Sequence, residues 1–71
     1  MIEEYDNNSV ILKDCECICD SRKAILVSSD LFDEPLWFPL SQIHDDSEVY
    51  KNGTSGNFIF SNWIAKEKEL I

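Results

Sequence analysis

Basic residues are scarce in this sequence. Its 71 residues include six Lys and Arg against fourteen Asp and Glu, so the formal net charge at pH 7 is −8. The imbalance lies in residues 1–48, which hold twelve acidic and three basic residues, whereas residues 49–71 hold two acidic and three basic ones. Nucleic-acid binding depends on neutralising phosphates with Lys and Arg. We therefore expect no direct contact with DNA or RNA.

Long apolar runs are also missing, and none approaches the roughly 18 residues that a membrane span requires. The first eight residues, MIEEYDNN, are acidic and polar, unlike a secretory signal or an organellar presequence. These absences predict a cytoplasmic protein with no membrane contact. The chain is nevertheless 44% hydrophobic and 11% aromatic, which is too apolar for a disordered segment. Its length predicts a single domain over residues 1–71 with a thin core.

The sequence lacks the motifs of common catalytic sites. It has no Gly-rich phosphate loop, no HExxH and no nucleophile elbow. The one histidine, His44, lies beside Asp45 and Asp46, a pairing that any acidic loop could produce. Asp45, Asp46 and Glu48 with Asn52 could suggest a calcium site, but they lack the ligand spacing of an EF-hand loop. We predict a protein that is not an enzyme and that holds no cofactor.

Three cysteines alternate with other residues in CECIC, as Cys15, Cys17 and Cys19. Side chains two apart in a strand share a face, so all three thiols are expected on one inward face together with Ile11, and Leu12 is expected on the opposite face. A zinc site usually shows C-x-x-C spacing and four ligands, and only His44 could join them. We expect small apolar core side chains in a reducing compartment and no metal. A small metal-binding domain is the least favoured alternative.

Alternating apolar and polar residues predict an antiparallel sheet. The expected strands cover residues 9–19, 24–29, 36–43 and 57–60. Ser61 is expected to cap a helix from residue 62 to about residue 70. The fold class is therefore α+β, with a small curled antiparallel sheet of about four strands, SH3-like or a partly open barrel, and one C-terminal helix.

Two segments bear on function. In the third expected strand, Phe38 is predicted to enter the core with Leu36 and Leu40, while Trp37 takes the opposite face. Residues 44–56 form a thirteen-residue polar connection, which is long for so small a domain and is expected to be a mobile or functional loop.

Parts of the chain resemble a group of small proteins common in phages and other mobile elements. The resemblance rests on KAILV at 23–27, WFPLSQI at 37–43 and WIAKEKEL at 63–70, and it covers residues 23–70. The shared pattern has Trp-x-Pro-x-Ser-Gln-Ile at its centre. This chain departs from it at Ser61-Asn62, where Pro-Glu is usual, and at Leu40, where Lys is common. Most such proteins lack an assigned activity, so the resemblance implies a genomic setting in a bacterial host more than a mechanism.

Small size, acidity and this resemblance predict an anti-CRISPR-like inhibitor. It would bind a basic host protein, such as a CRISPR effector or another nucleic-acid-binding protein, and act there as a nucleic-acid mimic. The alternative is an interaction module of phage replication or regulation that docks by its aromatic face or sheet edge, with acidity serving only solubility. Either could be a monomer or a homodimer. Trp37 is expected either to pack beside Trp63 or to stay partly exposed. The nine expected binding residues are Asp14, Glu16, Asp20, Asp33, Glu34, Trp37, Asp45, Asp46 and Glu48.

Overall fold

A computed structural model describes residues 2–71 of the chain. Within these residues the chain forms five antiparallel strands, one 3-10 helix and one α-helix. In chain order the elements are β1 (Ile2–Asp6), β2 (Ser9–Asp20), β3 (Ala24–Ser28), β4 (Leu36–Pro39), η1 (Leu40–Gln42), β5 (Ser55–Ser61) and α1 (Asn62–Glu67). The predicted α+β class, a small antiparallel sheet with one C-terminal helix, is confirmed.

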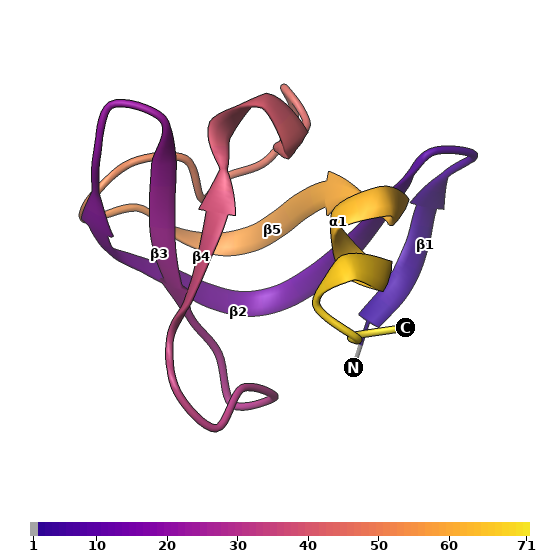
Figure 1. Cartoon of the computed structure of the whole chain (residues 1–71), viewed down its shortest axis with the longest axis horizontal. Coiled ribbons are helices and arrows are strands. Elements are labelled where there is room, and N and C mark those ends of the chain that lie inside the picture. Colours follow the sequence, from indigo (N-terminus) through magenta and orange to yellow (C-terminus); the bar gives the residue numbers. More distant parts are fainter. Residues whose placement is uncertain (1) are drawn as a thin grey trace.

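The long strand β2 organises the sheet. Its first half pairs with β1 and its second half with β3 along one edge, while β5 pairs along the other edge. β4 follows on the outer side of β3. Figure 1 shows β2 as a long curved strand across the molecule, with α1 packed at the end that β1 occupies. The sheet does not close into a barrel, because the region after β4 meets β5 through the isolated bridge of Ile43 with Phe60 and a few hydrogen bonds, and not through a paired strand.

The strand β1 was not predicted. Its sequence, IEEYD, is acidic and has few of the residues that favour strands. It forms because it pairs with β2 through a tight turn, in which the Asn8 N–H donates to Asp6 Oδ1 at 2.8 Å. Ile2 packs against the core from this strand. Pairing in three dimensions therefore outweighs the local preference.

A bulge in β2 changes which of its side chains point toward the core. Asp14 has a φ of 60°, and the pairing with β5 shifts between Leu12 and Cys15. The extra residue lets Leu12 and Cys15 both point inward, each 1% exposed. The predicted alternation was right for Cys15 and Cys17 but wrong before the bulge, where it placed Ile11 inward and Leu12 outward.

A second irregularity lies between Cys17 and Cys19. Cys17 is buried, whereas Cys19 is exposed. The prediction that all three thiols share the inward face was therefore wrong for Cys19, because the shift in register turns its side chain outward.

Strand β4 ends earlier than predicted. It stops at Pro39, and η1 follows, with the Ile43 N–H donating to the carbonyl of Leu40 at 3.2 Å. Phe38 is fully buried, as predicted, and Trp37 points outward. Leu40 was expected in the core but is exposed, since the turn of η1 breaks the alternation.

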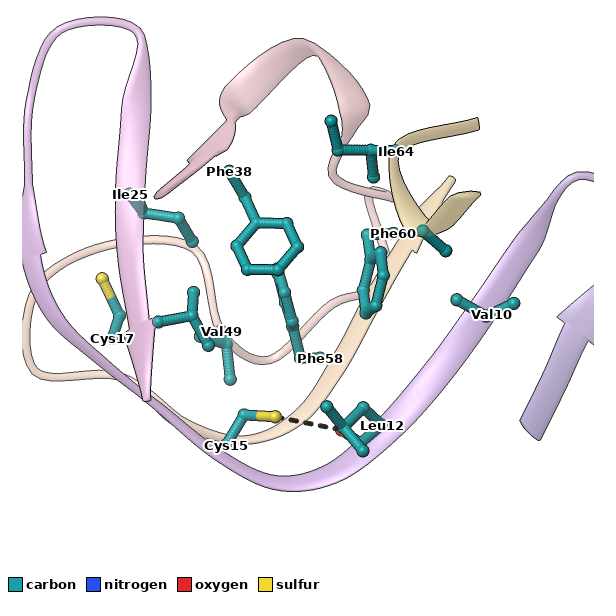
Figure 2. Close-up of a cluster of buried hydrophobic side chains, with 12 residues drawn as sticks. Val10, Leu12, Cys15, Cys17, Ile25, Phe38, Val49, Phe58, Phe60 and Ile64 are labelled. Atoms are coloured by element: carbon teal, nitrogen blue, oxygen red, sulfur yellow. Dashed lines mark hydrogen bonds between the residues drawn. The ribbon is translucent and has the colours of Figure 1, made fainter. Parts of the chain in front are cut away.

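The core centres on three phenylalanines from two strands. The ring centroid of Phe38 lies 4.8 Å from that of Phe58 and 5.2 Å from that of Phe60, and the last two are 4.6 Å apart. Figure 2 shows these rings between Ile25 on one side and Ile64 of α1 on the other. Edge-to-face and stacked rings at these separations add to the stability that their buried area gives.

The helix begins as predicted and ends sooner. Ser61 accepts the N–H of Ile64 at 3.2 Å, which caps α1. α1 ends at Glu67 instead of near residue 70. Glu69 takes a φ of 59°, and the Leu70 N–H donates to the carbonyl of Ala65 at 2.8 Å. This is the pattern of a Schellman motif, which folds Leu70 back onto the core.

The connection between η1 and β5 is fastened to the sheet. Val49 is fully buried, and the Ser47 hydroxyl accepts the N–H of Ile59 at 3.1 Å. The Glu48 carboxylate accepts the N–H of Asn57 at 2.8 Å. These contacts were not predicted, since the connection was expected to be polar throughout. They fix the position of the segment that carries His44 and the acidic residues beside it.

Candidate protein-binding surfaces

An acidic cluster forms where β1 meets the start of this connection. We call it the His44 cluster; its members are Tyr5, Asp6, His44, Asp45 and Asp46. The Nε2 atom of His44 lies 3.4 Å from Asp6 Oδ2, and its Nδ1 atom lies 3.8 Å from Asp46 Oδ2. The Tyr5 hydroxyl donates to Asp46 Oδ2 at 2.6 Å, and the Tyr5 ring meets the His44 ring edge-on, with centroids 5.1 Å apart. Residues 38 or more positions apart in the chain thus converge on one surface point.

Hydrogen bonds fix the orientation of the imidazole. The Asp46 N–H donates to His44 Nδ1 at 3.0 Å. A nitrogen that accepts this bond carries no proton in the neutral ring, which leaves Nε2 as the donor facing Asp6. His44 therefore lies between the turn after β1 and the acidic connection, with Nε2 facing the Asp6 carboxylate and Nδ1 accepting the Asp46 N–H.

Local bonds set the ionisation of two members. The Tyr5 pKa is raised, first because its hydroxyl donates to the Asp46 carboxylate, then through desolvation and the nearby negative charges. The Asp6 pKa is lowered, chiefly because the backbone N–H of Asn8 donates to its carboxylate. At neutral pH the Asp6 carboxyl is accordingly ionised and the Tyr5 hydroxyl is protonated.

An open hollow of about 480 Å³ adjoins the cluster. It is lined by Leu40, Ile43, His44, Asp45, Ser47 and Tyr50. The ring of Tyr50 is 51% exposed, and the Lys51 ammonium lies 5.6 Å from its centroid. The surface here combines an exposed aromatic ring and aliphatic side chains with the carboxylate of Asp45.

The other predicted acidic residues lie on separate elements. Asp14 is at the bulge of β2, Glu16 is on the outer face of that strand, and Asp33 and Glu34 are in the β3–β4 connection, all exposed. Two more are used within the fold: Asp20 accepts the N–H of Asn52 at 3.0 Å, and Glu48 accepts that of Asn57. Their carboxylates stabilise the chain's own turns.

Sequence reasoning missed three members of the cluster, Tyr5, Asp6 and His44. His44 was noted only as a neighbour of Asp45 and Asp46, and Tyr5 and Asp6 lie on the strand that was not predicted. The signal that could have found them is the run Asp6-Asn7-Asn8, since Asp and Asn favour turns, directly before a predicted strand. A hairpin there brings β1 back along β2, and this places Asp6 beside the connection that carries His44.

The predicted aromatic residue Trp37 lies on the outer face of the sheet. It is 45% exposed and stands opposite Leu26 on β3, which in turn stands opposite Cys19 on β2. The three side chains share one face, because paired residues in antiparallel strands point the same way. We call this row the outer stripe. A second exposed indole, Trp63 on α1, is 58% exposed.

The free edge of β4 is poor in donors. The Leu40 N–H donates to the carbonyl of Lys23 at 2.7 Å. Since every second residue of an antiparallel strand bonds to the same neighbour, the backbones of residues 36, 38 and 40 face β3. The backbones of residues 35, 37 and 39 therefore face away from β3. Two of the three are Pro35 and Pro39, which have no N–H, so only Trp37 offers a donor. An incoming strand would find few partners.

The cysteines show no sign of a metal site. Within residues 2–71 no group of three or more His, Cys, Asp or Glu side chains is placed to hold a metal ion. Burial raises the pKa of the Cys15 thiol to about 11 and also raises that of Cys17.

Within residues 2–71, no helix has the length and apolarity to cross a membrane.

The fold and these surfaces describe a small α+β protein with an open antiparallel sheet. No protein-family model matches the chain, and no curated protein or solved structure matches it.

Proposed function

We propose that this protein is a non-enzymatic binding protein whose acidic surface occupies a basic, nucleic-acid-binding site on another protein. The observation that carries the proposal is the His44 cluster, where Asp6, Asp45 and Asp46 come together at an exposed surface of a chain with net charge −8. Hydrogen bonds hold the carboxylates of Asp6 and Asp46 in place, so these side chains lose little conformational entropy when a partner binds.

Fixed carboxylates on a surface suit a site that normally receives phosphates. Such a site uses Lys and Arg to neutralise a regular row of negative charges. Exposed charges speed association more than they strengthen the final complex, because they act over the distance at which two proteins first meet. Salt screens them over roughly 8 Å at physiological ionic strength. The proposed function therefore predicts binding that weakens steeply with salt.

In its specific form, the proposal is an inhibitor from a phage or mobile element that acts in the cytoplasm of the bacterial host. The partner would be a host defence protein such as a CRISPR effector. The resemblance of residues 23–70 to small phage proteins supports this setting, and the acidity supports the mode of action.

Competition with nucleic acid tests the proposal. The tagged chain is used to capture host proteins, and the captured protein is then challenged with its own guide RNA or with single-stranded DNA. We expect nucleic acid to displace the chain, and the chain to displace nucleic acid, in a concentration-dependent way. A partner that binds both at once would contradict the proposal.

A second candidate function rests on Trp37. An indole that is 45% exposed on a sheet face favours a docking module that uses its aromatic face, with the acidity serving solubility. The scarcity of donors on the β4 edge disfavours the edge version of this idea. Salt-independent capture that is lost in Trp37→Ala would favour this function over the first.

A further inference from the structure

The hollow beside the His44 cluster combines two kinds of surface. Leu40 and Tyr50, both exposed, give it an aliphatic and an aromatic wall, and Asp45 is the one carboxylate among its lining residues. Its volume of about 480 Å³ lies in the lower half of the range of roughly 300–1,000 Å³ for pockets that hold small molecules. The hollow therefore has room for one long side chain.

Asp45 differs from the other carboxylates of the cluster. Asp46 accepts the Tyr5 hydroxyl, and Asp6 accepts the Asn8 N–H. Within residues 2–71, the Asp45 carboxylate takes part in no hydrogen bond or ion pair. Asp45 is exposed, so its charge is available to a partner.

The ring of Tyr50 is within reach of cations. The Lys51 ammonium lies 5.6 Å from its centroid, a separation at which a cation–π contact forms. Lys51 is not among the residues that line the hollow, and the sequence has no Lys or Arg from residue 24 to residue 50. The lining residues thus include an acidic side chain and no Lys or Arg.

We propose that the hollow receives an arginine side chain of the basic partner, which stacks on the Tyr50 ring and binds the Asp45 carboxylate. This inference rests on the proposed function. A guanidinium is planar and weakly hydrated; it stacks on aromatic rings and binds carboxylates through parallel N–H bonds. Nucleic acid offers arginine the same two kinds of group, a flat base and an anionic phosphate. The hollow thus presents an arginine with the two groups that it meets in a nucleotide.

Other occupants fit the hollow less well. An apolar side chain would leave the Asp45 carboxylate desolvated without a partner, and an anion would be repelled by it. A lysine matches the charge, but its ammonium is compact and strongly hydrated and does not stack as a guanidinium does. A free small molecule would remain largely in water, because the hollow is open, whereas bound small molecules usually have roughly 70–90% of their surface buried.

Two blocked peptides of equal charge, acetyl-Gly-Arg-Gly-amide and acetyl-Gly-Lys-Gly-amide, separate arginine recognition from general attraction. Each is titrated into the full chain, and the backbone amide signals are followed by NMR. We expect saturable shifts at Ile43, Asp45 and Tyr50 and a dissociation constant of roughly 1–20 mM for the arginine peptide. The lysine peptide should bind at least about threefold more weakly. Equal constants for the two peptides, or equal shifts around Asp14 and Glu16, would overturn the proposal.

Substitutions at Tyr50 test the stacking. The backbone N–H of Tyr50 donates to Thr54 Oγ1 at 3.0 Å, a bond that any residue except proline can keep. Tyr50→Leu retains an apolar side chain without a ring, so the preference for arginine over lysine should disappear, whereas Tyr50→Phe should retain it. Trp63→Leu, which removes an exposed ring outside the hollow, should bind both peptides as the wild type does.

An unchanged preference for arginine in Tyr50→Leu would overturn the proposal. Thermal melts show whether this variant is folded. The comparison of the two peptides on the wild type decides the proposal even if it is not.

The arginine hollow and the proposed function fail separately. Against the captured partner, Tyr50→Leu should raise the dissociation rate about 3–10-fold and leave the association rate close to that of the wild type, because it changes no charge. A partner that competes with nucleic acid but dissociates equally fast from the wild type and Tyr50→Leu would contradict the arginine hollow alone. A chain that prefers the arginine peptide but captures no nucleic-acid-binding protein would contradict the proposed function alone.

Discussion

Trp37 and Phe38 are neighbours in the chain, yet they belong to two different regions of the molecule. Phe38 is fully buried among other rings on the inner side of the curled sheet, whereas Trp37 is 45% exposed on the outer side. The same strand thus supplies an anchor for the core and an aromatic group for the surface. What separates the two roles is the alternation of side chains along the strand.

The comparison extends to the whole sheet. The inner face is apolar and aromatic, and it is completed by α1 and by Val49 from the connection. The outer face of the sheet carries Glu16 and the outer stripe, and the His44 cluster lies at the surface where β1 meets the connection. Changes on the inner side should therefore alter folding, and changes on the outer side should alter association.

The largest expected effect is that of Phe38→Ala. Removing a fully buried ring should lower the free energy of unfolding by about 3–5 kcal/mol, which is a large part of the stability of a small domain. Trp37→Ala, one residue away, should cost less than about 1 kcal/mol. Urea denaturation followed by circular dichroism measures both. Similar losses for the two variants would break the inner-versus-outer comparison.

Gly56→Ala tests the contact between the connection and the sheet. Gly56 has a φ of 126°, and an added Cβ would lie 2.5 Å from the Glu48 carboxylate. We expect a loss of roughly 1–3 kcal/mol from strain and the displaced carboxylate. Gly53→Ala is the matched control, since Gly53 also has a positive φ but open space around it. The account requires the larger loss, in chemical denaturation, for Gly56.

A gain in stability is expected from Glu69→Gly. Glu69 has a φ of 59° at the end of α1, and glycine takes this conformation without the steric cost of a Cβ. The free energy of unfolding should rise by about 0.5–1 kcal/mol. Glu67→Gly, inside the helix, should instead lower it by up to about 1 kcal/mol. A loss for both variants would contradict a steric cost of the positive φ at residue 69.

Thiol labelling sharpens the comparison without changing a residue. Cys19 is exposed, whereas Cys15 is buried and its pKa is raised to about 11. At pH 8 only about 0.1% of a thiol with that pKa is thiolate, the reactive form. Under native conditions, iodoacetamide should modify Cys19 at least about 100-fold faster than Cys15. Equal rates, measured by peptide mass spectrometry, would mean that the inner face opens readily.

Much of the fold could be predicted from the sequence because its signals are local. Alternation and turn residues gave the β2–β3 hairpin, and Ser61 gave the start of α1. The features that were not predicted depend on contacts between residues far apart in the chain. β1 depends on pairing with β2, the bulge at Asp14 reverses the facing of Ile11 and Leu12, and Val49 is buried by contacts from several elements.

The candidate site was predictable only in part, for the same reason. Asp45 and Asp46 stand out as charges in a polar connection. Their contact with Asp6 and Tyr5 could not be predicted, because it depends on the hairpin that pairs β1 with β2. The roles of Asp20 and Glu48 as acceptors for backbone N–H groups likewise depend on residues that lie elsewhere in the chain.

The most direct test of the proposed function is the association rate of an Asp45 variant. Asp45 is the member of the His44 cluster best suited to a charge reversal, since Asp46 accepts the Tyr5 hydroxyl and Asp6 faces His44. Asp45→Lys is compared with Glu67→Lys, an equal charge change on α1, against the captured partner across a salt series. We predict that Asp45→Lys slows association roughly 3–10-fold at low salt, with the difference fading at high salt, while Glu67→Lys has a much smaller effect. Equal rates for the two variants at every salt concentration would contradict an acidic surface at the His44 cluster.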